Sequence, residues 1–213
     1  MLGCIMDKII NTTDGVSNLD GVFERREGTY SILRFTRRFE VPQERLWYAI
    51  SDCQGALLWL NPVDKLELSV GGAFAIRTYD ENNPSAWTSG IVTEVEPLKT
   101  LEYTWNQGPY SGGPAMQSKV RYELEPDSEG TGLTITHTLY DTAGDKYVVT
   151  FLANWHMHLD ALAQVMAGKY RDFADYLDRK AAESGLARRE FLINLVIGLH
   201  GAYGNKVGRT KSS

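Results

Sequence analysis

The feature that most constrains the fold is a change of hydrophobic period late in the chain. Upstream, between residues 30 and 140, apolar and polar residues alternate in short segments, as on strands with one buried face. Between residues 146 and 169, apolar side chains instead recur with the period of a helix and form one stripe. The stripe consists of Tyr147, Val148, Phe151, Leu152, Trp155, His158, Leu159, Leu162, Val165 and Met166. The sequence therefore predicts strands followed by one long amphipathic helix that can cover their apolar face.

Seven strands are expected, and the short turns between most of them favour an antiparallel meander. In the first strand, SILRFTRRFEV, the alternation places Leu33 and Phe35 on one face and Arg34 and Thr36 on the other. Two short helical segments follow, the first beginning at Pro42. The six further strands are expected at residues 63–70, 73–80, 86–96, 99–106, 116–126 and 131–140.

Composition excludes several classes of protein. The net charge of −5 argues against a nucleic-acid surface, which would need a basic stripe. Two cysteines are too few for a disulfide framework, and the N-terminus lacks the pattern of a signal peptide, so we expect a cytoplasmic protein. No apolar run approaches the roughly 20 residues needed to span a bilayer, so we expect no membrane insertion.

The chain divides into three parts by pattern. Residues 1–27 lack sustained periodicity and are expected to be a flexible leader. Residues 28–168 hold the strands and the long helix and should form the main domain. Residues 169–213 are expected to be a helical extension, with one helix at about 170–184 and another at 188–200, before a polar tail.

Seven stretches, in order, resemble a known family. They are LRFTRRFEVPQERLWYAISD (33–52), WLNP (59–62), VGGAF (70–74), GIVTEVEPLKTLEYTW (90–105), VRYELEP (120–126), GTGLTITHT (130–138) and NWHMHLDALAQVMAG (154–168). Together they resemble the free-standing members of the family named for the activator of heat shock protein 90 ATPase, within the START-like or SRPBCC superfamily. One departure is Asn154, where the family pattern has glycine.

The resemblance implies an α+β helix-grip fold. In that fold a curved, antiparallel, seven-stranded sheet wraps around a long C-terminal helix, with two short helices after the first strand. It also implies a pocket between sheet and helix. The chaperone activator itself carries a separate N-terminal docking domain with a characteristic motif, and residues 1–27 contain nothing like it. A role as a chaperone ATPase activator-like partner is therefore the last-ranked alternative.

Two histidines are the candidate polar groups of that pocket. His137 alternates with Ile135 and Leu139 on one strand face and should point toward the long helix, while His158 lies in the helix stripe and should point back. Each could be a core histidine bonded to a neighbour, or an anchor or acid–base group for a ligand. His156 and His158 point about 200° apart on a helix and cannot share an ion. We expect no metal and no cofactor, since HExxH, a phosphate loop and a nucleophile elbow are all missing.

Large rings are the remaining signal. These rings could simply pack the core of the protein, which requires no function. An empty apolar pocket of roughly 300 Å³ would lower the stability of the fold by about 7 kcal/mol, so a sizeable pocket must be filled by side chains, hydrated or occupied by a ligand. We therefore expect binding of an apolar or aromatic small molecule. The alternative is a cyclase- or aromatase-like enzyme using His137 and His158, helped by Tyr103 or Tyr122. The candidate ligand-binding residues are Trp59, Phe74, Tyr103, Trp105, Tyr122, His137, Phe151, Trp155 and His158.

The last predicted helix has an apolar face that must be covered. A homodimer is expected through Phe191, Leu195 and Leu199, where one patch meets its copy across a two-fold axis. Packing of the same face within the chain is the alternative.

Overall fold

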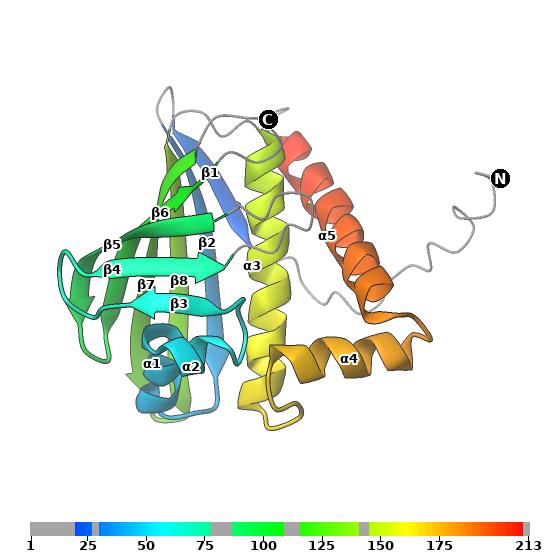
Figure 1. Ribbon diagram of the computed structural model, residues 1–213. Coiled ribbons are helices and arrows are strands. Elements are labelled where there is room, and N and C mark those ends of the chain that lie inside the picture. The colour runs from blue at the N-terminus through cyan, green and yellow to red at the C-terminus, as the bar shows by residue number, and fades with distance from the viewer. Residues whose placement is uncertain (1–19, 27–29, 78–86, 109–115, 141–144, 211–213) are drawn as a thin grey trace.

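An open antiparallel sheet forms one side of the computed structural model (Figure 1), which describes residues 20–26, 30–77, 87–108, 116–140 and 145–210. Its eight strands lie in the order β1-β2-β8-β7-β6-β5-β4-β3. The strands are β1 (Val22–Arg26), β2 (Tyr30–Phe39), β3 (Val63–Leu66), β4 (Ala73–Arg77), β5 (Trp87–Glu96), β6 (Thr100–Gln107), β7 (Met116–Asp127) and β8 (Gly130–Tyr140). The expected α+β helix-grip fold is confirmed, with one strand more than the seven predicted.

Strict alternation gives the sheet one apolar face. In β2 the side chains of Leu33, Phe35 and Phe39 are buried, and in β8 every second residue is buried. These two strands pair in register, with Leu33 opposite His137. The β7–β8 hairpin closes at Gly130, whose φ is 156°. A methyl group at this position would lie 2.1 Å from the carbonyl oxygen of Phe39, so the turn excludes any side chain.

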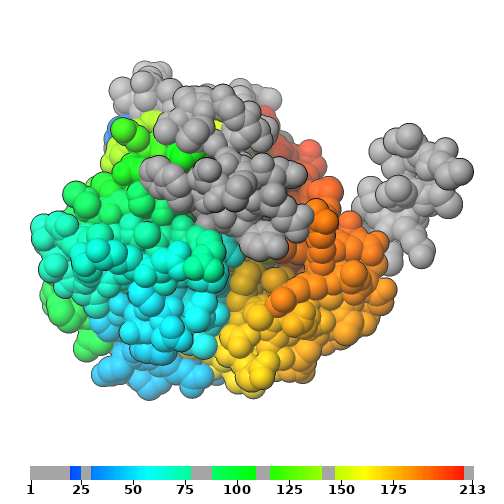
Figure 2. Space-filling model, viewed as in Figure 1, coloured from blue at the N-terminus to red at the C-terminus, as the bar shows by residue number. Residues whose placement is uncertain are grey.

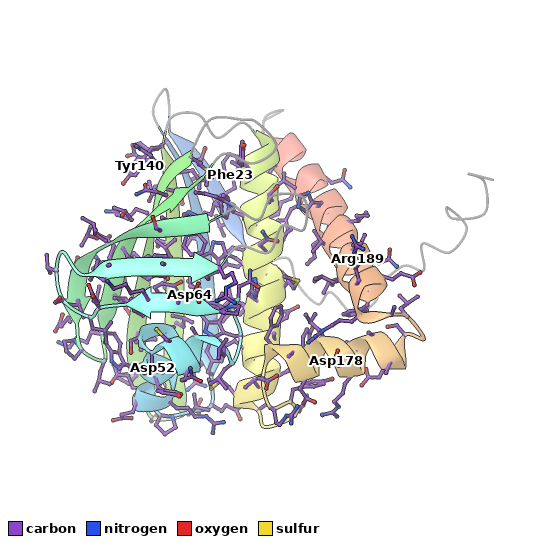
Figure 3. The ribbon with its side chains drawn as sticks, in the orientation of Figure 1. Phe23, Asp52, Asp64, Tyr140, Asp178 and Arg189 are labelled. Atoms are coloured by element: carbon purple, nitrogen blue, oxygen red, sulfur yellow. The ribbon has the colours of Figure 1, made fainter. Side chains whose placement is uncertain are left out.

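Two short helices carry the chain from β2 to β3, which lie near opposite edges of the sheet. These are α1 (Gln43–Ser51) and α2 (Cys53–Ala56). Asp52 lies between them, and its carboxylate accepts hydrogen bonds from the backbone N–H groups of Gln54 and Gly55 (Figure 3). This cap turns the chain sharply and places Trp59, three residues after α2, in the core.

The long helix α3 (Asp145–Met166) runs along the inner side of the sheet, as the hydrophobic stripe predicted (Figure 1). Its residues Val148, Leu152 and Leu159 are almost fully buried. Because the sheet curves toward α3, side chains from both elements fill the space between them. The core of the protein therefore lies at this contact.

Two further helices, α4 (Phe173–Glu183) and α5 (Arg188–Thr210), complete the chain. The helix α5 packs on α3 on the side away from the sheet (Figure 1). On the face shown in Figure 2, the yellow and gold surface lies beside the blue α1–α2 region, and the orange-to-red surface of α5 lies further away. Phe191 and Leu199 are 6% and 1% exposed, so both are covered within this chain. The expectation that these two residues contact a second copy is therefore wrong, whereas Leu195 is only partly buried.

Besides β3, which was expected over residues 63–70 but ends at Leu66, two boundaries differ from the sequence prediction. The strand β1 lies inside the segment expected to be a flexible leader, whose residues 1–19 and 27 fall outside the described part of the chain. The helix α5 continues ten residues beyond the predicted end at residue 200. Both differences bring the two ends of the described chain against the same helix, α3.

Within the described residues, none of the helices combines the length and the apolar character that crossing a membrane would require.

Candidate functional site

Three strands, β4, β6 and β7, place aromatic rings on the inner face of the sheet, with β5 lying between β4 and β6. Phe74 of β4 stacks on Tyr103 of β6, with ring centroids 4.0 Å apart and planes inclined by 18°. Trp105 lies two residues further along β6, on the same face, and its ring is 6.3 Å from that of Tyr103 at an angle of 22°. The next strand, β7, contributes Tyr122, whose ring centroid lies 5.7 Å from that of Tyr103. The rings of Phe74, Tyr103 and Trp105 thus lie against one another, while that of Tyr122 is inclined by 49° to Tyr103.

The helix α3 and the segment after α2 close this row. Trp155 of α3 lies 5.9 Å from Trp105 and 6.2 Å from Tyr122, measured between ring centroids. Trp59 lies 6.2 Å from Trp155, and its indole N–H donates to the carbonyl of Ala49 at 2.9 Å. Figure 3 shows side chains between the sheet and α3.

Eight of the nine predicted site residues form one connected set of rings, which we call the aromatic cluster. It consists of Trp59, Phe74, Tyr103, Trp105, Tyr122, His137, Phe151 and Trp155. The cluster extends from Trp59, which is fully buried, to Trp105, which is only partly buried. It therefore spans the protein from the interior to a point where solvent has access.

Both nitrogens of His137 are hydrogen-bonded inside the cluster. The indole N–H of Trp155 donates to Nδ1 at 3.0 Å, so Nδ1 carries no proton, and Nε2–H donates to Oγ of Ser118 at 2.9 Å. The Ser118 hydroxyl in turn donates to the carbonyl of Trp105 at 2.7 Å. Burial lowers the pKa of His137 to about 3. The imidazole is thus neutral, with its tautomer fixed by its neighbours.

Among the described residues, one side-chain hydrogen bond joins two rings of the sheet, and both rings are phenols. The hydroxyl oxygens of Tyr103 and Tyr122 lie 2.8 Å apart. Burial raises the pKa of both groups above the usual value for tyrosine. Both phenols therefore keep their protons at neutral pH.

His158 lies apart from the aromatic cluster. Its Nδ1–H donates to the carbonyl of Trp59 at 2.7 Å, and its ring lies 4.7 Å from Phe173 of α4. Burial lowers its pKa to about 4. His158 therefore ties α3 to the segment after α2, and the two histidines that the sequence singled out have different neighbours.

A group of charged side chains on the other side of α3 was not predicted. Arg37 of β2 forms ion pairs with Asp20 at 2.5 Å and with Asp160 of α3 at 2.6 Å. The fully buried imidazole of His156 lies 3.3 Å from each of these carboxylates, and its Nδ1 lies 3.0 Å from the hydroxyl of Tyr203. We call Asp20, Arg37, His156, Asp160 and Tyr203 the ionic cluster.

The ionic cluster fixes its protonation states through mutual contacts. Although burial alone would lower it, contacts with Asp160 and Asp20 raise the pKa of His156 above its usual value. Burial alone would raise the pKa of Asp20, but hydrogen bonds from His156 and Arg37 hold it at about 2. The i, i+4 spacing of His156 and Asp160 was a signal in the sequence, whereas nothing indicated that Asp20 would join them.

The ionic cluster also fastens the N-terminal segment to α5. The backbone N–H of Gly21 donates to the hydroxyl of Tyr203 at 3.1 Å, and Lys206 donates to the carbonyl of Gly21 at 2.7 Å. A methyl group on Gly21 would lie 2.5 Å from Phe35 and 2.9 Å from the Tyr203 hydroxyl. Only glycine permits this approach. The described residues contain no group of three or more His, Cys, Asp or Glu side chains placed to hold a metal ion.

Comparison with known proteins identifies a family and several structural neighbours. The family model described as activator of Hsp90 ATPase homolog 1-like protein matches residues 40–167. No curated protein matches the sequence. CalU16 from Micromonospora echinospora has a similar structure, with a TM-score of 0.59 and 20% identity over 87% of this chain and 95% of its own.

Two other solved structures share the fold. DynU16, from the dynemicin biosynthetic locus, gives a TM-score of 0.53 at 20% identity, over 64% of this chain and 47% of its own. The Aha1 dimer from Colwellia psychrerythraea gives 0.51 at 16% identity, over 63% of this chain and 95% of its own. At these identities the similarity shows the fold alone.

Proposed function

The chain belongs to the activator of Hsp90 ATPase homolog 1-like family, and we propose that it binds an apolar or aromatic small molecule at the aromatic cluster between the sheet and α3. The observation that carries this proposal is the continuity of the cluster from the fully buried Trp59 to the partly exposed Trp105. Ligand sites are mostly apolar surfaces with a few placed polar groups, and the cluster has that composition.

The charge state of the cluster favours a neutral ligand. The pKa of Tyr103 and of Tyr122 is raised by burial, and that of His137 is lowered by burial, so all three groups are uncharged near neutral pH. A charged ligand group placed among them would lose its hydration without gaining a partner of opposite charge, which is costly. DynU16 has the same fold and comes from the dynemicin biosynthetic locus, and this origin supports the proposal.

The hydrogen bonds of His137 and the position of His158 argue against the cyclase-like alternative. A general base needs a free lone pair within reach of the substrate. In His137 the lone pair on Nδ1 accepts from Trp155, and Nε2 carries the proton given to Ser118. His158 donates through Nδ1 to a backbone carbonyl, which leaves the lone pair of its Nε2 outside that bond, but its ring faces Phe173 and lies apart from the aromatic cluster. We therefore propose binding rather than catalysis, and no contact described above favours a chaperone-partner role.

Ligand binding can be tested by thermal shift and native mass spectrometry with a panel of lipids, flavonoids and aromatic polyketides. A ligand at about 100 times its Kd stabilises the fold by about 2.7 kcal/mol, which raises Tm by about 5–10 °C for a chain of this size. Phe74→Leu, inside the cluster, should reduce the shift. Tyr48→Leu, an exposed ring on α1, is the matched control and should leave it unchanged.

Two outcomes would contradict the proposal. Either no compound of the panel binds, or Phe74→Leu and Tyr48→Leu change the shift equally.

The homodimer remains a separate prediction, to be checked by light scattering of the full chain. Some support comes from Aha1 of Colwellia psychrerythraea, which is a dimer.

A further inference from the structure

The ionic cluster attaches the N-terminal segment to the protein through a histidine that can lose its charge. We propose that the contacts of Asp20 and Gly21 with this cluster form a pH-dependent latch. Protonated His156 keeps residues 20–26, which include β1, against the protein, and loss of that proton at mildly alkaline pH releases them. The other strands and α3 stay folded in both states, so the latch does not depend on the proposed ligand.

The charges of the ionic cluster balance only when His156 is protonated. Asp20 and Asp160 each carry a negative charge, and Arg37 pairs with both, at 2.5 and 2.6 Å. The fully buried imidazolium of His156 supplies the second positive charge, 3.3 Å from each carboxylate. After deprotonation, two carboxylates share one guanidinium around a buried ring, and a buried charge without its partner is costly.

The contacts between His156 and the carboxylates depend on the charge of the ring. Nε2 of His156 lies 3.3 Å from Asp160, yet it has no hydrogen-bond partner among the described residues, so the attraction is between charges. A neutral imidazole carries a proton on one nitrogen only, so one of the two carboxylates then faces a lone pair. Asp160 is fixed within α3, whereas Asp20 begins the N-terminal segment. Asp20 is therefore the carboxylate that can move away.

The remaining attachments of residues 20–26 lie at an edge of the protein. The strand β1 is the last strand of the sheet and pairs on one side only, with β2. The hydroxyl of Tyr203 that accepts from the Gly21 N–H also lies 3.0 Å from Nδ1 of His156, so the proton on His156 affects both contacts. Terminal and edge segments open locally at the lowest free energy. Opening here would uncover the rings of Phe35 and Tyr203, against which Gly21 packs.

The groups around His156 keep their charge states near neutral pH. Asp20, whose pKa is about 2, is ionised, and the guanidinium of Arg37 is always charged. Burial raises the pKa of Tyr203 and of Tyr176 on α4, so both phenols keep their protons. The charged and titratable groups that face the ionic cluster are Asp20 from the N-terminal segment, Arg37 from β2, Asp160 from α3, Tyr176 from α4, and Tyr203 and Lys206 from α5.

The other three histidines of the chain are already neutral where the latch opens. Burial lowers the pKa of His137 to about 3, that of His158 to about 4, and that of His200 below 6.5. Burial alone would also lower the pKa of His156, but Asp160 and Asp20 raise it above 6.5. The latch is therefore fully closed below pH 6.5 and opens as pH rises through the pKa of His156 in the closed state.

Amide hydrogen exchange followed by mass spectrometry, on the full chain between about pH 6 and about pH 9, tests the latch. Protection is expressed relative to the exchange of an unstructured peptide at the same pH. For residues 20–26 it should fall by up to about tenfold for each pH unit between 6.5 and the pKa of His156 in the closed state, and then level off. The protection of β7 and β8 should stay constant over the same range.

Three variants separate the charge of His156 from its packing. His156→Gln cannot take up a proton, so residues 20–26 should be weakly protected at every pH, without a step. Asp160→Asn keeps the imidazole but removes a carboxylate that raises its pKa, so the step should move to lower pH. His200→Gln replaces another histidine, on α5, and is the matched control, which should retain the wild-type profile.

A second measurement needs no variant. In the wild-type protein labelled with ¹⁵N, the Gly21 amide resonance and the imidazole resonances of His156 should shift with one common midpoint as pH is raised. The latch would be overturned by different midpoints, by protection of residues 20–26 that does not change with pH, or by a step that survives His156→Gln. An equal loss of protection in β7 and β8 would also overturn it, because the whole fold would then be opening.

Discussion

Replacing His137 with glutamine should remove a defined part of the acid sensitivity of the fold. A glutamine side chain offers one acceptor oxygen toward the Trp155 N–H and one amide donor toward Ser118, so it can replace the hydrogen bonds of the imidazole, which are 3.0 and 2.9 Å long. It cannot take up a proton. The change therefore separates the titration of His137 from its role in packing.

The magnitude follows from linkage between protonation and folding. The pKa of His137 is about 3 in the folded chain against 6.5 when unperturbed, because burial disfavours the imidazolium. A lowered pKa means that its stabilising contribution is complete above pH 6.5 and is lost as pH falls toward 3, since the unfolded chain takes up the proton first. Between about pH 7.5 and about pH 5, the expected loss from this residue is about 2 kcal/mol.

Urea denaturation followed by circular dichroism, at both pH values, measures the effect. The free energy of unfolding of the wild type should fall by about 2 kcal/mol more between the two pH values than that of His137→Gln, whatever the absolute stability of the variant. Tyr48→Phe should behave as the wild type. If wild type and His137→Gln lost stability in parallel, the imidazole would not be held neutral by burial, and the reasoning about the aromatic cluster would fail.

Three further perturbations test other contacts. His158→Gln should remove a similar acid sensitivity of about 2 kcal/mol over the same interval, because burial lowers the pKa of His158 to about 4; an unchanged urea midpoint difference would contradict this. His156→Gln should act in the opposite sense. Burial alone lowers the pKa of His156, but Asp160 and Asp20 raise it above 6.5. The stabilisation that protonated His156 gives to the fold is therefore complete below pH 6.5 and is lost as pH rises through the pKa of His156 in the folded chain. Its thermal midpoint should be furthest below that of the wild type in mild acid and approach it in alkali, and parallel profiles would exclude the ion pairs. Tyr203→Phe should lower the free energy of unfolding by about 1–3 kcal/mol, because the Gly21 N–H loses its acceptor, and a wild-type urea midpoint would argue against that bond.

The interior of the fold was largely predictable because it follows from periodicity. Alternation in β6 and β7 decided that Tyr103, Trp105 and Tyr122 share the inner face, and the helical stripe decided that Phe151 and Trp155 meet them. Periodicity carries no information on hydrogen bonds, which depend on the register between strands. The sequence could not show that Ser118 would lie beside His137 rather than one residue away.

The ends of the chain were less predictable, for a different reason. The apolar face recognised in the sequence ended at Leu199, so the predicted helix stopped at residue 200. Glycines at positions 201, 204 and 208 also lower helix propensity by up to about 1 kcal/mol each. Instead, Leu199, Tyr203 and Val207, spaced by four, are buried and extend the helix through tertiary packing. The strand β1 is short and gains its place from pairing with β2 and from Gly21 beneath Tyr203, neither of which is a local signal.

The contact between Gly21 and Tyr203 joins positions 182 residues apart, and this separation has a consequence for synthesis on the ribosome. At a rate of about 5–20 residues per second, the N-terminal strands emerge roughly ten seconds or more before the helix that holds them. Even β2 cannot enter the sheet until β8, which pairs with it, has been translated. The nascent chain therefore exposes its first two strands through most of translation. Folding of these strands should complete only after α5 has left the exit tunnel.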